Sequence, residues 1–162
     1  MGYSNVWNTQ LTSNTVDAQE DVGAIRFDQD PTYGRRKYKY VQAAADTTVA
    51  NGTCLAYSDV YRRVVSNDRT DTYQSAVAGV GIGAITASYH GWIQIGGYHE
   101  ALITDGGNDV AISDHLILHT TGDGQCDRVA AGTAITYTAL GVAAAADDDT
   151  TDLVAAYLNC PE

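Results

Sequence analysis

The chain has 162 residues, of which 44% are hydrophobic and 18% charged, so it is large enough for one domain with a core and an appended segment. Nine Lys and Arg residues against 20 Asp and Glu residues give a net charge of −11. This balance argues against nucleic acid and anionic membranes as partners, because both attract cationic surfaces. No stretch reaches the roughly 20 apolar residues of a membrane span, and the first residues do not read as a signal peptide. We therefore expect synthesis in the cytoplasm.

Residues 1–34 are polar and follow neither a helical period nor a clear two-residue period. We predict an extended N-terminal arm here, which is either disordered or ordered by a partner. Trp7 and Phe27 are unusual in a pure spacer, and they favour an arm that docks on something. This division implies that deleting residues 1–34 leaves a folded body.

Residues 35–48 begin with a basic and aromatic cluster that contains Arg35, Arg36, Lys37 and Lys39. Tyrosines alternate with the lysines, which predicts a strand. Such a strand can bind single-stranded nucleic acid by stacking. The alternative is that the charges face solvent or an acidic neighbour, and the acidity of the chain favours it.

From residue 49 onward, short apolar runs alternate with Gly-, Asn- and Asp-rich turns. This spacing predicts a mainly β fold, a small antiparallel β-barrel or sandwich over residues 35–162. The expected strands are 54–57, 77–85, 91–95, 101–103, 116–118, 134–142 and 153–158. The Ala-rich stretch 139–146 could instead add a helical turn or two, and the acidic run 147–149 is expected to be a solvated turn.

Two pairs of segments in this region are similar to each other. Residues 49–55 resemble residues 110–116, and residues 78–81 resemble residues 140–143, at offsets of about 61 and 62 positions. A two-fold arrangement of strands would produce this similarity, and so would chance matching among small apolar residues.

Cysteine and histidine patterns do not support a metal site. Cys54, Cys126 and Cys160 are odd in number and widely spaced, so we expect buried or half-buried free thiols. His115 and His119 flank a strand-like run, where residues four apart lie roughly 13 Å from each other. Two imidazoles that far apart cannot bind the same metal ion, because zinc–nitrogen bonds are only about 2 Å long. The acidic loops lack the spacing of a calcium loop, and nucleophile-elbow and phosphate-loop motifs are missing from the sequence. We predict no metal, no cofactor and no enzymatic activity.

Residues 77–98 contain the most distinctive pattern, a Gly-rich apolar run followed by Gly91, Trp92, Ile93, Gln94 and Ile95. We expect Gly91 to permit a tight turn and Trp92 to anchor the strand after it. Alternation then places Ile93 and Ile95 on one face of the strand and Trp92 and Gln94 on the other. Trp92 is expected in the core, with an interface as the alternative.

This pattern resembles that of tailed-bacteriophage capsid decoration (cement) proteins, closely over residues 77–98 and loosely over residues 38–158. His90 and the acidic run 147–149 depart from the family pattern. The resemblance implies a β-tulip-like fold and a virion protein on the outer surface of the assembled head, made in the host cytoplasm. It would clamp neighbouring major capsid proteins and stabilise the assembled lattice by mass action, with avidity from many repeated contacts across the shell.

The resemblance further implies a homotrimer and a role for the arm in reaching the capsid, in part by strand addition. The residues expected to bind the capsid are Trp7, Phe27, Arg35, Arg36, Lys37 and Lys39, and the four basic ones are expected to meet acidic capsid patches. The alternative function is a carbohydrate- or host-binding β module of a virion fibre or surface protein, since 11 Tyr and 2 Trp could stack on sugars. A head–tail joining or tail-tube subunit is a third option.

Overall fold

The computed structural model describes residues 7–69, 76–106, 109–134, 138–147 and 152–161, and in them the chain forms ten β-strands. The strands are β1 (Ile25–Asp30), β2 (Gly34–Ala43), β3 (Cys54–Tyr57), β4 (Val64–Ser66), β5 (Val77–Gly81), β6 (His90–Ile103), β7 (His115–Leu118), β8 (Cys126–Val129), β9 (Ala139–Ala143) and β10 (Leu153–Asn159). The predicted mainly β fold is confirmed. The helical interpretation of residues 139–146 is wrong, because β9 pairs there with β7 and β10. Most of the acidic run 147–149 and part of the predicted strand 134–142 lie outside the described residues.

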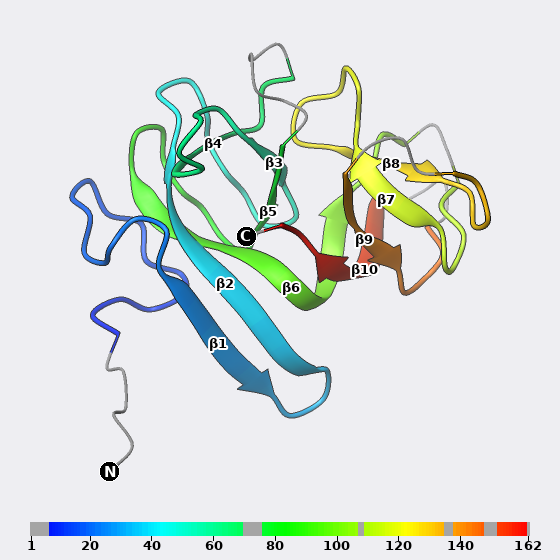
Figure 1. Cartoon of the computed structure of the whole chain (residues 1–162), viewed down its shortest axis with the longest axis horizontal. Helices are drawn as coiled ribbons and strands as arrows, with labels where there is room; N and C mark the ends of the chain where they lie inside the picture. The colour runs from blue at the N-terminus through cyan, green and yellow to red at the C-terminus, as the bar shows by residue number, and fades with distance from the viewer. Residues whose placement is uncertain (1–6, 70–75, 107–108, 135–137, 148–151, 162) are drawn as a thin grey trace.

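One sheet curls so that its first half closes on itself. Strands β2, β4, β3, β5 and β6 are neighbours in that order, and β6 pairs again with β2. The β2–β4 pairing is parallel, whereas the other strand pairings of the described residues are antiparallel. Strand β6 then continues into the second half, where β10, β9, β7 and β8 follow it. Figure 1 shows these two lobes, joined by the long strand β6.

The two lobes repeat the same pairing scheme, which explains the internal similarity of the sequence. Leu55 of β3 lies opposite Gly79 of β5, and Leu116 of β7 lies opposite Gly141 of β9. A register shift follows the leucine in both pairs. These positions are 61 and 62 residues apart, as in the sequence match. The structure therefore favours a two-fold arrangement over chance similarity.

The main core fills the inside of both lobes and includes Ile93 and Ile95 of β6. Trp92 lies on the opposite face of β6, in a second hydrophobic cluster. This alternation was predicted and is confirmed, as is the burial of Trp92, whose exposed fraction is 1%. The predicted role of Gly91 is wrong: it lies inside β6, and a Cβ there would come within 2.9 Å of the Ser13 carbonyl oxygen. Gly91 thus permits close approach of the N-terminal segment rather than a turn.

The described part of the predicted arm lies on the body of the protein. Residues 25–30 form β1, which pairs with β2 over its whole length, and the boundary expected after residue 34 falls at the start of β2. Thr15 forms an antiparallel bridge with His90 at the start of β6. Backbone groups of Thr15 and of β1 therefore find hydrogen-bond partners within this chain.

The three cysteines are buried and free, as predicted. Within the described ranges, the protein has no helix with the length and hydrophobicity needed to cross a membrane.

Candidate interaction surface

Strand β2 organises the residues that the sequence singles out, because its side chains alternate between two faces. Tyr38 and Tyr40 point to one face and are buried. Lys37 and Lys39 point to the other face. Strand β1 lies antiparallel to β2 and places Phe27 directly opposite Lys37. The two faces of this hairpin have very different surroundings.

The tyrosine face is covered by residues 7–24, which form a second small core. Trp7 meets Trp92 edge to face, with ring centroids 5.2 Å apart and an interplanar angle of 87°. Tyr40 packs against the same Trp92 at 5.2 Å. Partly buried apolar residues of the N-terminal segment, Leu11 among them, surround these rings. Trp7 therefore packs within this second hydrophobic cluster.

Buried polar atoms of this cluster are paired with the N-terminal segment. The Trp92 indole Nε1 donates to Thr9 Oγ1 at 2.9 Å, and Thr9 Oγ1 donates to Glu20 Oε1 at 3.0 Å. The backbone N–H of Gln19 donates to the Tyr40 hydroxyl at 3.3 Å. Each of these bonds avoids the free-energy cost of burying an unpartnered polar group. Hydrogen bonds as well as packing therefore fix the position of the N-terminal segment.

The opposite side of the hairpin is open and cationic. Phe27 is 48% exposed, and the Arg35 guanidinium carbon lies 3.8 Å from the centre of its ring. Lys37 Nζ lies 5.6 Å from the same ring. An aromatic ring with cations at its face is a stable exposed arrangement, because the ring quadrupole attracts the charge.

Lys39 continues this row toward the interior, where its Nζ donates to the Tyr57 hydroxyl at 2.8 Å. Arg62 lies over the same Tyr57 ring, with its guanidinium carbon 5.8 Å from the centroid. Burial, followed by repulsion from Arg62, lowers the pKa of Lys39, and Lys37 acts in the same direction. Burial raises the pKa of Tyr57 to about 12. Three cationic side chains, those of Lys37, Lys39 and Arg62, are therefore close enough to influence one another here, although the chain is acidic.

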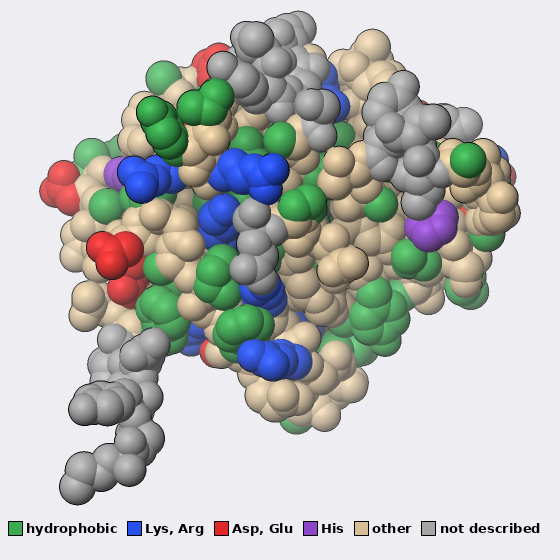
Figure 2. All heavy atoms as spheres, in the orientation of Figure 1, with side chains coloured by type: hydrophobic (Ala, Val, Ile, Leu, Met, Phe, Trp, Pro, Cys, Tyr) green, Lys and Arg blue, Asp and Glu red, His purple; other side chains and the backbone are tan. Residues whose placement is uncertain are grey.

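We call this surface the cation–aromatic face, and it consists of Phe27, Arg35, Lys37 and Arg62, which border the buried pair Lys39 and Tyr57. The loop before β4 lies beside it, where Val60 is 62% and Tyr61 79% exposed. Figure 2 shows Lys and Arg side chains interleaved with hydrophobic ones over β1, β2 and the neighbouring loops. Sequence reasoning missed this loop, although Tyr61-Arg62-Arg63 is a second basic and aromatic cluster that could have indicated it.

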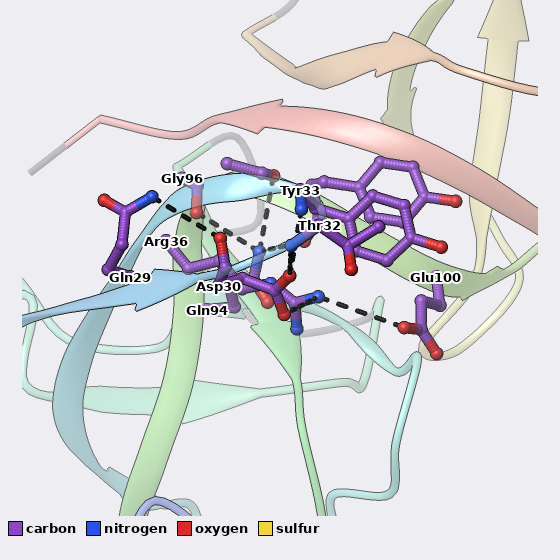
Figure 3. Close-up of polar contacts among 10 residues, drawn as sticks. Gln29, Asp30, Thr32, Tyr33, Arg36, Gln94, Gly96 and Glu100 are labelled. Atoms are coloured by element: carbon purple, nitrogen blue, oxygen red, sulfur yellow. Dashed lines mark hydrogen bonds and ion pairs between the residues drawn. The ribbon is translucent and has the colours of Figure 1, made fainter.

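Arg36 belongs to the other side of the hairpin, and carboxylates face it. Its Nη2 lies 3.0 Å from Asp30 Oδ2 and 3.9 Å from Glu100 Oε1 (Figure 3). Asp30 also accepts the backbone N–H groups of Tyr33 and Thr32, and these bonds, the Tyr33 bond first, lower the pKa of Asp30. The Arg36 charge is therefore largely balanced within the protein.

The six predicted contact residues divide into two groups. Phe27, Arg35 and Lys37 lie together on the cation–aromatic face. The other three are engaged inside the chain: Trp7 packs on Trp92, Arg36 pairs with Asp30, and Lys39 is 6% exposed. For Lys39 in particular, a direct surface contact does not fit its burial. The five motif residues from Gly91 to Ile95 are all buried and build the body.

This surface suits binding rather than group transfer. Exposed aromatic and guanidinium groups are the side chains most often enriched in protein interfaces. Among the described residues, no three His, Cys, Asp or Glu side chains are grouped closely enough to hold a metal ion.

Comparisons with known proteins give little beyond this geometry. No family model matches the chain, and no curated protein matches it. The chain is similar to a solved structure described as the head fiber gp8.5 N base in bacteriophage phi29, with a TM-score of 0.48 and 17% sequence identity. The similarity covers 77% of this chain and 97% of that one. Likeness at this level does not identify what this chain binds.

Proposed function

We propose that this protein is a capsid decoration protein of a tailed bacteriophage, located on the outer surface of the head. The resemblance of residues 77–98 to that family supports the assignment, and those residues form β5 and the first part of β6, the strands around which the body is built. The proposed role is structural and includes no chemical reaction. Binding only to the assembled lattice stabilises the lattice by mass action.

One observation supports the docking site: the cation–aromatic face is a positive surface on a chain with a net charge of −11. Phe27 and Arg35 are exposed there and already ordered against each other, so little conformational entropy is lost when a partner covers them. Acidic patches of a major capsid protein have complementary charge. The acidic remainder of the surface would keep the bound molecules soluble and facing outward.

A reconstitution experiment tests this proposal. Expanded phage heads without decoration are mixed with the purified protein, and coating and thermal rupture are measured. We expect even coating and a higher rupture temperature, with affinity that falls as salt rises. Heads that stay bare, or coated heads that rupture as easily as bare ones, would refute the proposal.

A pair of charge-matched variants locates the docking site. The double variant Arg35→Gln/Lys37→Gln removes two positive charges from the cation–aromatic face, and we expect at least about tenfold weaker binding to heads. The control Thr120→Glu/Thr133→Glu changes the net charge by the same amount at exposed positions of the other lobe. Equal loss in both variants would show that only net charge matters, and would refute this site.

The resemblance also supports a homotrimer as the working unit. Three copies that each present a cation–aromatic face would gain avidity on a lattice of repeated sites. Sedimentation analysis of the free protein and image averaging of coated heads test this part separately. A monomer in both settings would contradict it.

A further inference from the structure

Strand β1 is an edge of the sheet. It pairs with β2 on one side, and within the described residues no strand lies on its other side. Figure 1 shows β1 on the outer side of the β1–β2 hairpin. The side chains of Phe27 and Gln29 are exposed along it. An edge strand presents backbone N–H and C=O groups that can pair with a strand of another chain.

The register of the hairpin indicates which backbone groups of β1 point outward. The Tyr40 backbone N–H donates to the Ala24 carbonyl at 2.9 Å, so Ala24 and every second residue after it bond to β2. The residues between them turn their N–H and C=O groups to the opposite side of the strand. The outward groups are therefore those of Ile25, Phe27 and Gln29.

The charges of β1 match those of a second copy of the same strand. Arg26 and Asp28 lie on one face, with Arg26 Nη2 3.2 Å from Asp28 Oδ2. When two copies pair antiparallel about a two-fold axis at Phe27, Arg26 of each copy lies directly opposite Asp28 of the other. The two Phe27 residues then face each other, and the outward groups of Ile25 meet those of Gln29.

Other registers of the same pairing lack this match. The smallest shift that keeps N–H groups opposite C=O groups is two residues, and it places either Arg26 opposite Arg26 or Asp28 opposite Asp28. Facing opposite charges stabilise a pair of strands, whereas facing like charges destabilise it. Charged residues on an edge strand commonly prevent pairing with other chains. On β1 they instead select one register, because their signs alternate about Phe27.

We propose that β1 pairs with β1 of a second copy of this chain, antiparallel and centred on Phe27. The two-fold axis is perpendicular to the sheet, so Phe27 and Arg35 of both copies lie on the same side and the two cation–aromatic faces become neighbours. The inference goes beyond capsid decoration, because the contact joins copies of this chain and needs no phage head. It is also separate from a three-fold contact, and on a shell it would join molecules of neighbouring trimers.

Cysteine trapping on the full-length protein tests the register. In the proposed pairing the two Cα atoms at position 27 are about 5.5 Å apart, within the range of a disulfide. We expect Phe27→Cys to form a disulfide-linked dimer during copper–phenanthroline oxidation of concentrated protein, as seen on a non-reducing gel. The three native cysteines are buried, and the unmodified protein is the control for them.

Gln29→Cys is the matched control, since Gln29 is exposed on the same edge strand. In the proposed register, position 29 of one copy lies opposite Ile25 of the other. The two positions 29 are then four residues apart along the strands, or roughly 13 Å, which is too far for a disulfide. We expect little or no linked dimer from this variant.

Two variants of opposite charge test the complementarity. Arg26→Asp places carboxylates opposite each other, and Asp28→Arg places guanidinium groups opposite each other. We expect each variant alone to self-associate at least about tenfold more weakly than the unmodified protein in sedimentation equilibrium. An equimolar mixture makes both facing pairs attractive again, so we expect mixed dimers to form. Recovery in the mixture also excludes misfolding as the cause of the loss.

Three results would overturn the proposal: no linked dimer from Phe27→Cys, equal linkage in Phe27→Cys and Gln29→Cys, or a mixture that associates no better than either charge variant alone. Linkage of Phe27→Cys to the major capsid protein on coated heads, without linkage between copies, would overturn it in favour of a capsid strand at this edge. Coating of heads by the unmodified protein is measured separately, so capsid decoration can fail or succeed independently of this contact.

Discussion

The two faces of the β1–β2 hairpin both contain aromatic residues, but one face is covered by the chain and the other is exposed. On one face, Tyr40 is fully buried beneath the N-terminal segment and packs with Trp92. On the other face, Phe27 of β1 stays 48% exposed beside Arg35. Aromatic side chains stabilise the fold only where another segment covers them. Where nothing in the chain covers them, the same chemistry is available to a partner.

The described part of the N-terminal segment is part of the folded body. The sequence suggested a separable arm, but its residues 9–20 supply the partners of Trp92 and Tyr40. A segment that satisfies buried polar atoms cannot be removed without cost.

Deletion of residues 1–24 should destabilise the protein strongly, because it uncovers Tyr40 and Trp92 together and removes the Thr15–His90 bridge. We expect the free energy of unfolding to fall by more than about 3 kcal/mol, the lower end of the cost of losing one large buried aromatic side chain. Urea denaturation followed by tryptophan fluorescence and circular dichroism measures it. An unchanged unfolding midpoint would restore the arm as a separate element.

Replacement of Trp92 by Ala should lower the free energy of unfolding by about 3–5 kcal/mol. The change leaves a cavity among Trp7, Tyr40 and Leu11 and removes the donor to Thr9 Oγ1. Thermal and urea denaturation give the value, and Trp92→Phe serves as the control that keeps most of the ring volume. A melting temperature close to that of the unmodified protein would place Trp92 at an interface instead.

His99 makes the covered side sensitive to pH. Burial, and to a lesser degree the Arg36 charge, lowers the pKa of His99 from 6.5, whereas the Gly81 carbonyl and Glu100 act in the opposite direction. Below pH 6.5 the unfolded chain takes up a proton that the folded chain resists, so the free energy of unfolding should decrease as the pH falls through this range. Above 6.5 this contribution is complete.

Unfolding measured across this pH range should show a weaker dependence in His99→Gln than in the unmodified protein. His115→Gln is the control, since His115 is a partly exposed strand residue in the other lobe. A steeper loss of stability at low pH in His99→Gln would contradict the sign of this prediction.

Replacement of Phe27 by Ala should change the free energy of unfolding by no more than about 0.5 kcal/mol, as is usual for exposed positions. The ring is half-exposed, and its neighbours are the cationic side chains of Arg35 and Lys37 rather than core residues. The same variant should weaken binding to phage heads. A large loss of stability would mean that Phe27 belongs to the fold, and that the open face is smaller than described.

Local patterns in the sequence determined much of the fold. The apolar run at 54–57 became β3 with the predicted bounds, and the alternation of Trp92 with Ile93 placed them on opposite faces as expected. The offset of about 61 residues likewise indicated the two equivalent lobes. These features follow from residue spacing, because side-chain direction in a strand alternates with every residue.

Only the tertiary structure decided which surfaces are covered. Strand β1 has no clear apolar alternation that would predict it from the sequence. It forms because residues 34–39 of β2 supply its backbone partners. Lys39 and Lys37 are equivalent in the sequence pattern, yet Lys39 is buried against Tyr57 from a strand 18 positions away. Burial depends on long-range contacts, which a local pattern does not contain, and for this reason the candidate surfaces emerged only from the folded chain.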